Sequence, residues 1–264
     1  MRSYISDTTF RSCFCDFENL RGGSFYWRDL GSVIQNKVCY DSSWCSQTGQ
    51  AYGVTVSENE VNHCNFSSLI NLGVAENKYK YSAGQSKGFV IMNNNNYSDC
   101  RCDSYAGFST RGNKFTLKFT NLRNINCSDI ICDILFLKET NLVQNINIIN
   151  TKGNTIIFNY QIDTIIYDSC VFMNNQSPCF IDCRGNKNTI ISNMFIENTN
   201  KIYGNPIYNN TKTSDQNVVN DILSLDIEVC LRTKYPEVST AFDLKFVDMY
   251  NIFGSTYIVL LSQK

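Results

Sequence analysis

Two short stretches of this chain repeat one pattern at a fixed distance. The stretches SCVFMNNQ (Ser169–Gln176) and NMFIENTN (Asn193–Asn200) each place an Asn three residues after a Phe. The two phenylalanines, Phe172 and Phe195, lie 23 residues apart. Recurrence at an interval of about 20 to 50 residues is typical of repeat architectures, in which each unit buries its apolar face against its neighbours. The interval therefore limits the chain to folds that stack copies of one short unit.

Apolar residues follow the same interval in three columns through the middle of the chain. The first column contains Ile125, Ile148, Phe172 and Phe195, the second contains Ile131, Ile156, Phe180 and Tyr203, and the third contains Val143, Ile166 and Ile190. Nearer the start of the chain, Phe17 and Tyr40 are also 23 residues apart, and so are Phe66 and Phe89. Each unit thus holds three apolar segments, which are too short and too rich in β-branched and aromatic side chains for helices.

Three short strands joined by turns describe one coil of a solenoid. Each strand stacks on its equivalent in the next coil, which gives three parallel sheets, and connections between parallel strands are right-handed in nearly all cases. The sequence therefore predicts an all-β fold, a right-handed parallel β-helix with three-strand coils of about 23 residues. The composition agrees, because 34 Asn favour turns and 26 Ile favour strands, whereas Pro occurs only 3 times.

We expect residues 1–264 to form a single β-helix domain. The coils would occupy residues 10–205, with insertions around residues 41–114, where the columns are harder to follow. Residues 206–264 would form the last coils or a C-terminal cap, because the open end of a stack of strands needs a cover.

Small polar residues lie three positions after each member of the first column. They are Ser128, Thr151, Asn175 and Asn198. In a stack, equivalent residues lie about 4.8 Å apart, which is the spacing of neighbouring strands. We therefore expect these side chains to close the turn and to hydrogen-bond to the copy in the next coil.

The 13 cysteines leave three interpretations open. The pairs Cys13/Cys15 and Cys100/Cys102 would each place two side chains on one face of a strand, as buried thiols in a core. Because the count is odd, disulfides would leave at least one cysteine unpaired in a monomer. The two pairs would also suit a four-cysteine zinc site, although no C-x2-C pair is present and His63 is the only histidine.

Charge and hydropathy argue against two classes of partner. The formal net charge of −1 gives no general attraction to nucleic acid or to acidic membranes. The first residues, MRSYISDTTF, lack the apolar core of a secretion signal. The late apolar run TYIVLL (256–261) is too short to span a bilayer. We expect a soluble chain with no nucleic-acid partner and no transmembrane segment.

An enzyme on this fold would need paired carboxylates. Parallel β-helices include polysaccharide lyases and pectin hydrolases, and glycoside hydrolysis takes two carboxylates about 5 to 9.5 Å apart. The candidate column is Asp133, Phe158 and Asp182, whose two aspartates would lie about two coils, or 10 Å, apart. The chain contains no adjacent Asp-Asp pair, no Arg-Gly-His motif and no cluster of Asp for calcium. The sequence therefore assigns no catalytic, cofactor-binding or metal-binding residue.

Short motifs in the chain resemble those of known β-helix repeat proteins. RGGSFYW (Arg21–Trp27) resembles the G-G-apolar motif of chlamydial polymorphic membrane proteins, and FMNN (172–175) and FIEN (195–198) resemble their F-x-x-N motif. Cys-rich early coils, Asn- and Ile-rich later coils and a C…C…G-Q stretch are similar to the right-handed β-helix repeat proteins of trichomonad parasites. That stretch consists here of Cys39, Cys45, Gly49 and Gln50. The resemblance covers most of residues 10–200 and implies a pectate-lyase-like solenoid with a surface-associated or adhesin-like role.

The function that follows from these patterns is a non-enzymatic structural or adhesive binding module, with a protein or a glycan as its ligand. The family resemblance implies a place at the cell surface, either for this module or for a longer surface protein that contains it. Two alternatives stay open. One is a carbohydrate-active enzyme, a lyase or a hydrolase, on the same fold, and the other is an intracellular structural component.

Overall fold

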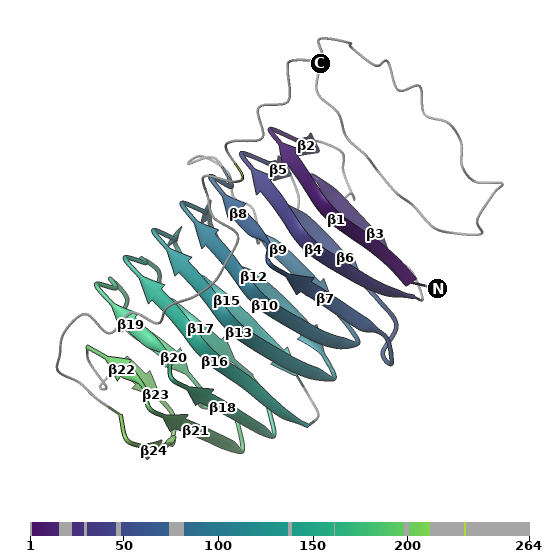
Figure 1. Ribbon diagram of the computed structural model, residues 1–264. Helices are drawn as coiled ribbons and strands as arrows, with labels where there is room; N and C mark the ends of the chain where they lie inside the picture. The colour runs from purple at the N-terminus through teal and green to yellow at the C-terminus, as the bar shows by residue number, and fades with distance from the viewer. Residues whose placement is uncertain are drawn as a thin grey trace, which may run out of the picture.

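The protein is a parallel β-helix, a rod in which successive coils of the chain stack on one another (Figure 1). The computed structural model describes residues 2–15, 23–28, 31–45, 49–73, 82–136, 139–160, 162–197 and 201–211, together with Cys230. All strand pairs among these residues are parallel, and neighbours in a sheet are separated by a full coil of chain. The predicted all-β parallel β-helix is confirmed.

The long sheet has twelve strands and nine successive rungs along the rod. Its strands, in order of pairing, are β1 (Arg2–Arg11), β4 (Ser32–Asp41), β7 (Val61–Asn65) with β8 (Ser68–Ile70), β10 (Phe89–Ser98), β13 (Lys114–Arg123), β16 (Thr140–Ile149), β18 (Thr164–Asp168) with β19 (Val171–Met173), β21 (Asn188–Ser192) with β22 (Phe195–Ile196), and β24 (Ile207–Asn209). The rungs run from the N-terminus at β1 to the green end of the rod at β24 (Figure 1).

The short sheet has eight strands and closes the coil on another side. Its strands are β3 (Phe25–Arg28), β6 (Tyr52–Thr55), β9 (Ala83–Ser86), β12 (Phe108–Gly112), β15 (Ile130–Phe136), β17 (Thr155–Asn159), β20 (Cys179–Asp182) and β23 (Ile202–Tyr203). Two further pairs of strands follow the long strands, namely β2 (Phe14–Cys15) with β5 (Trp44–Cys45) and β11 (Arg101–Cys102) with β14 (Asn126–Cys127).

A column of left-handed residues, one per rung, folds the long sheet lengthwise. Their φ angles lie between 47° and 54°, a region that residues other than glycine seldom occupy. The residues are Asp7, Lys37, Phe66, Asn94, Phe119, Asn145, Ser169, Asn193 and Asn210. Because every rung bends at the same place, the long sheet supplies two sides of each coil and the short sheet supplies the third. The predicted coil of three strand segments therefore holds.

One interior column of side chains runs along almost the whole rod. Its members are Phe10, Tyr40, Leu69, Tyr97, Leu122, Ile148, Phe172 and Ile196. The prediction is correct for Ile148 and Phe172 and wrong for the other two members. Ile125 is buried three residues beyond the column, and Phe195 pairs with Val171 instead of Phe172. In a strand, a shift of one residue moves a side chain to the opposite face.

The interval between coils is not constant, which explains these misplacements. From Phe10 to Tyr40 the chain takes 30 residues, whereas from Phe172 to Ile196 it takes 24. The steps from Tyr40 to Leu69 and from Leu69 to Tyr97 are 29 and 28 residues, within the region where insertions were expected. The predicted length of about 23 residues is thus close only for the later coils.

The other predicted columns are partly correct. Ile131, Ile156 and Phe180 stack, but Tyr203 lies opposite Asp182. In the third column Ile166 and Ile190 pair, although on the outer face of the sheet, and Val143 lies one position away, opposite Tyr167. Phe66 lies at the bend of its rung and not above Phe89, because their strands pair Asn65 with Asn93. Phe17 lies outside the described residues.

The motifs RGGSFYW (Arg21–Trp27) and C…C…G-Q contribute to packing between the early coils. A Cβ atom at Gly23 would collide with the backbone carbonyl oxygens of Gln50 and Trp44, so only glycine fits where these coils meet. The Gln50 side chain in turn accepts a hydrogen bond from the backbone nitrogen of Cys45, with an N–O distance of 3.1 Å. At the other end of the chain, β24 adds a ninth rung, while the rest of the predicted cap, apart from residues 210–211 and Cys230, lies outside the described residues.

Candidate functional site

A second column of left-handed residues lies where each coil leaves the long sheet. Their φ angles lie between 50° and 56°, and every member is Ser, Asn or Asp. The members are Ser12, Ser42, Asn71, Asp99, Asn124, Asn150 and Asn174, and we call this column the polar corner. Asn and Asp tolerate the left-handed region because their short side chains hydrogen-bond to nearby groups. The corner therefore explains why the sequence places these residue types once per coil.

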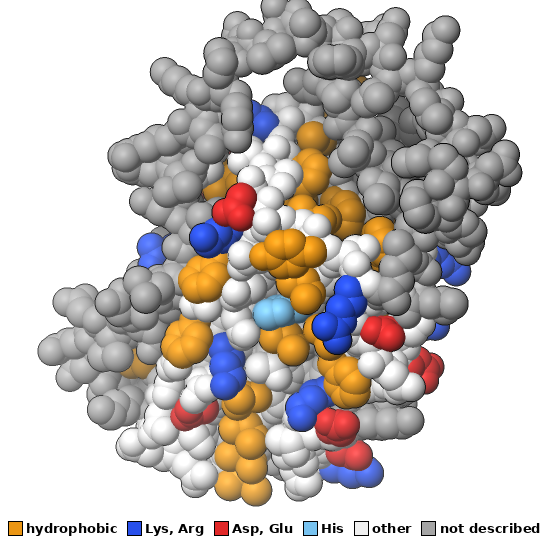
Figure 2. All heavy atoms as spheres, turned by 45° about the vertical axis from the view of Figure 1, so that its right-hand side comes forward, with side chains coloured by type: hydrophobic (Ala, Val, Ile, Leu, Met, Phe, Trp, Pro, Cys, Tyr) orange, Lys and Arg blue, Asp and Glu red, His pale blue; other side chains and the backbone are white. Residues whose placement is uncertain are grey.

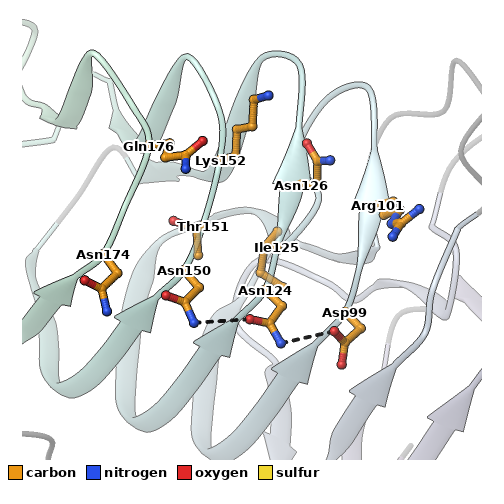
Figure 3. A pocket seen from close by; sticks show the side chains of 10 residues that line it. All are labelled: Asp99, Arg101, Asn124, Ile125, Asn126, Asn150, Thr151, Lys152, Asn174 and Gln176. Atoms are coloured by element: carbon orange, nitrogen blue, oxygen red, sulfur yellow. Dashed lines mark hydrogen bonds between the residues drawn. The ribbon is translucent and has the colours of Figure 1, made fainter.

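Side chains of the polar corner hydrogen-bond from rung to rung. Asn124 Nδ2 donates to Asp99 Oδ1 at 3.2 Å, and Asn150 Nδ2 donates to Asn124 Oδ1 at 3.5 Å (Figure 3). Asn174 lies on the next rung in the same row (Figure 3). The result is an exposed ladder of amide and carboxylate groups parallel to the axis of the rod.

The turn residues predicted from the sequence lie one position further, inside this corner. Asn175 Oδ1 accepts hydrogen bonds from Thr151 N at 2.9 Å and Thr151 Oγ1 at 2.8 Å, and Asn175 Nδ2 donates to Ile148 O at 2.9 Å. The predicted bonding between copies is therefore confirmed for this pair. The prediction for Ser128 is wrong, because Ile125 lies opposite Thr151 in the stack and Ser128 is exposed. Asn198 lies outside the described residues.

A second row of polar side chains runs beside the polar corner, two residues further along each coil. Its members are Arg101, Asn126, Lys152 and Gln176, which pair in register from rung to rung. Figure 3 shows these side chains projecting outward, in a row that runs parallel to the ladder. Neither the Arg nor the Lys has a carboxylate within ion-pair distance among the residues that the structure describes.

The two rows form the walls of a groove along this corner of the rod. Its volume is 430 Å³, and Ile125 and Thr151 line it between the rows (Figure 3). Four rungs at about 4.8 Å make it about 14 Å long. The charged groups in the groove are Arg101, Lys152 and Asp99, so the groove carries a net positive charge and is otherwise lined mainly by amides. Such a lining offers hydrogen-bond donors and acceptors at the regular spacing of the rungs.

The outer row continues towards the N-terminus as an aromatic pair. Phe14 and Trp44 lie opposite each other on neighbouring rungs, with ring centroids 5.7 Å apart and ring planes at 14°. Phe14 is 49% exposed. Gly73 occupies the rung between Trp44 and Arg101, and a Cβ there would collide with the carbonyl oxygen of Arg101. A flat apolar platform therefore lies in line with the charged groove.

The carboxylate column predicted for an enzyme is present on the short sheet. Asp133 pairs with Phe158, and Phe158 pairs with Asp182, so two rungs, or about 10 Å, separate the carboxylates. Burial raises the pKa of Asp133 to about 6. Hydrogen bonds from Arg184 lower the pKa of Asp182, with the closest N–O distance 2.6 Å. The column lies away from the groove, and Phe158 stands between its two acids.

The cysteines divide between a disulfide and buried thiols. Cys39 and Cys230 form a disulfide, with Cα atoms 5.6 Å apart. Arg11 Nη2 donates to Cys230 O at 2.7 Å, which adds a second link between this residue and the first rungs. Buried cysteines outside the disulfide include Cys13, Cys64, Cys100, Cys127, Cys132, Cys170, Cys179 and Cys183. Burial raises the pKa of Cys100 to about 12, so this thiol stays protonated at neutral pH.

In the part of the chain that the structure describes, no group of three or more His, Cys, Asp or Glu side chains is placed to hold a metal ion. His63 lies half-buried on the outer face of β7, and burial lowers its pKa. In the same residues, no helix has the length and apolar character needed to cross a bilayer.

Comparison of the chain with family models, with curated proteins and with solved structures finds no match. The fold and the site therefore define its class: a parallel β-solenoid with a polar, positively charged groove along one corner. The trichomonad resemblance and the adhesive role stay predictions.

Proposed function

We propose that the chain is a non-catalytic binding module whose groove holds an extended, acidic glycan. The observation that carries this proposal is the pair of polar rows at a constant repeat, with Arg101 and Lys152 lacking a carboxylate partner among the described residues. A guanidinium and an ammonium group bind carboxylate or sulfate strongly, through charge-assisted hydrogen bonds. The amides of Asn124, Asn126 and Asn150 suit the hydroxyls of a sugar, because each amide both donates and accepts.

The shape of the site favours a polymer over a compact ligand. The groove follows the axis of the rod and is about 14 Å long over four rungs. The stacked rings of Phe14 and Trp44 continue the same row and offer a flat apolar face to a sugar ring. A chain-like ligand that lies along the rod would meet the cations and the aromatic pair together.

A surface location fits this proposal better than an intracellular one. The Cys39–Cys230 disulfide links residues 191 positions apart in the sequence. Disulfides persist in oxidising, extracellular environments and are rare in reducing ones. This supports an adhesive module over the alternative of an intracellular structural component, and it agrees with the role that the family resemblance implies.

Replacing Lys152 with Glu is expected to weaken binding of polygalacturonate fragments about tenfold or more. The substitution removes a charge-assisted hydrogen bond, which is worth about 1.5–3 kcal/mol, and a tenfold change corresponds to about 1.4 kcal/mol. Isothermal titration calorimetry of the full chain, at low and high salt, measures the effect. Lys87→Glu, just after β9, is the matched control, because it makes the same charge change at an exposed position outside the groove.

Two results would contradict the proposal. One is equal affinity of the wild-type chain for polygalacturonate and for an uncharged glucan of the same length, because the cations would then have no role. The other is an equal loss of affinity in the Lys152→Glu and Lys87→Glu variants, because the effect would then come from net charge and not from the groove. Added salt should weaken binding, since exposed charge pairs are screened.

The carboxylate column supports a second candidate, an inverting glycoside hydrolase. Asp133, with its raised pKa, would be the acid, and Asp182, held ionised by Arg184, would be the base. We expect no cleavage, because Phe158 lies between the two carboxylates and the groove lies elsewhere. Release of reducing ends from polysaccharides, abolished by Asp133→Asn, would contradict the binding module and support this enzyme as the function.

A further inference from the structure

An apolar stripe runs along the outer face of the long sheet, before the bend. Nine residues stack in register from the first rung to the last. They are Tyr4, Ile34, His63, Ile91, Thr116, Leu142, Ile166, Ile190 and Ile207. Seven of the nine are apolar, and we call this row the outer stripe. Outward positions of a solvated strand are normally polar, so a stripe of this length is unusual for a free surface.

The outer stripe is accessible along its length. Its end residues, Tyr4 and Ile207, are 62% and 56% exposed, and the others are half-buried between neighbouring rungs. Figure 2 shows hydrophobic side chains above and below the single histidine. Every member of the outer stripe thus keeps part of its surface exposed.

The row of residues on the bend side of the outer stripe is almost uncharged. Its members are Ser6, Asn36, Asn65, Asn93, Lys118, Gln144, Asp168, Ser192 and Asn209, which include one Lys and one Asp. The amide of Asn65 donates to Asn36 Oδ1 at 3.2 Å, and Gln144 donates to Asp168 Oδ2 at 2.9 Å. An apolar centre with few charges and a polar margin is the composition of a protein interface.

We propose that the outer stripe packs against the outer stripe of a second copy of this chain, which gives a side-by-side dimer. The side chains of the stripe form a ridge that repeats about every 4.8 Å. The same sheet on a second copy of the chain has the same repeat, so the two ridges can fit together in register. Sheets that pack face to face lie about 10 Å apart and interleave their side chains. A two-fold arrangement uses one patch on both chains, so no second complementary surface is needed.

The dimensions match a small, reversible dimer interface. Eight steps of about 4.8 Å make the outer stripe about 38 Å long, and the flanking rows, two residues to either side at about 3.3 Å per residue, make the face about 13 Å wide. The resulting area, about 500 Å² on each chain or about 1,000 Å² in total, is near the lower limit for a specific interface. The other flanking row contains Arg2 and Lys114, and Lys114 is paired with Glu139 at 3.2 Å, so the face carries only a small net positive charge and two copies approach with little repulsion.

The test is sedimentation equilibrium of the full chain across a range of micromolar concentrations. We expect a reversible dimer, and we expect Ile166→Lys and Thr116→Lys to weaken it at least about tenfold, because each places two lysines in the apolar centre. Met173→Lys is the matched control, since Met173 is also a half-buried residue of the long sheet but lies beyond the bend. Thr116 is polar already, so its variant keeps the test valid if Ile166→Lys folds poorly.

Three results would overturn the dimer. They are a wild-type chain that stays monomeric at every concentration, an association that Met173→Lys weakens as much as the two stripe variants do, and a dimer that survives a denaturing, non-reducing gel. The last would be a disulfide between copies and not a packed interface. Circular dichroism and melting curves identify the variants that keep the β-helix. The result does not depend on the groove, so glycan binding and dimerisation succeed or fail separately.

Discussion

Replacing Phe172 with Asp is expected to destabilise the coils around it by more than about 4 kcal/mol. Phe172 is fully buried between Ile148 and Ile196, and its ring stacks on Phe180 with centroids 5.8 Å apart. The substitution creates a cavity, which costs about 3 to 5 kcal/mol for a buried Phe, and it adds a carboxylate whose burial is unfavourable. Because coils of a solenoid contact only their neighbours, the loss should begin in β16 to β22 and not in the whole rod.

Asn175→Ala is the control for this prediction. Its side chain makes three hydrogen bonds, two at Thr151 and one to Ile148 O, so its loss should cost about 2–3 kcal/mol. This is more than its turn position suggests, but still less than the cost at Phe172. Hydrogen exchange on both variants measures the difference strand by strand. Equal protection of β16 to β22 in the two variants would mean that Phe172 is not an interior residue.

Replacing Asp133 with Asn is expected to stabilise the protein at pH 8 by about 1–3 kcal/mol and to change little at pH 4. Burial raises the pKa of Asp133 from its ordinary 3.8 to about 6, so the folded state holds this proton more tightly than the unfolded state does. Wild-type stability should therefore fall as the pH rises from about 4 to about 7, with each pKa unit worth about 1.4 kcal/mol. The Asn side chain carries no charge to bury and can still accept the hydrogen bond from Ser109.

Urea unfolding at several pH values measures this effect. Asp182→Asn, in the same column, is the control with the opposite sign, because hydrogen bonds from Arg184 lower the pKa of Asp182. That variant should be less stable than the wild type at pH 8, and its deficit should shrink as the pH falls. If both variants changed stability in the same direction at pH 8, the burial of Asp133 would not be the cause.

The class of fold was predictable because burial recurs once per coil. Positions such as those of Ile148 and Phe172 must be apolar on every rung, and this requirement produces an interval of 24 residues in the later part of the chain. The same local logic correctly placed Asn175 beside Thr151 and stacked Asp133, Phe158 and Asp182. These features depend on neighbouring coils of nearly equal length, where counting residues is enough.

The register could not be predicted where coil lengths change or where both faces of a strand are apolar. Phe195 and Ile196 are both hydrophobic, and only the pairing of strands shows that Ile196 continues the interior column. Ile166 and Ile190 likewise suggest a core position, yet they lie in the outer stripe. Hydrophobicity identifies the strand in each case but does not say which face is covered.

The amino-acid sequence by itself determined that this chain forms stacked coils with Asn-rich turns, because burial and turn chemistry are local requirements that recur in every coil. Only the tertiary structure decided which side chains meet outside the coil. Trp44, Arg101 and Lys152 lie in different coils, and nothing in their local sequence indicates that they share one row. Their alignment depends on the length of every intervening coil and on the left-handed bends that set its register, which are long-range properties of the stack.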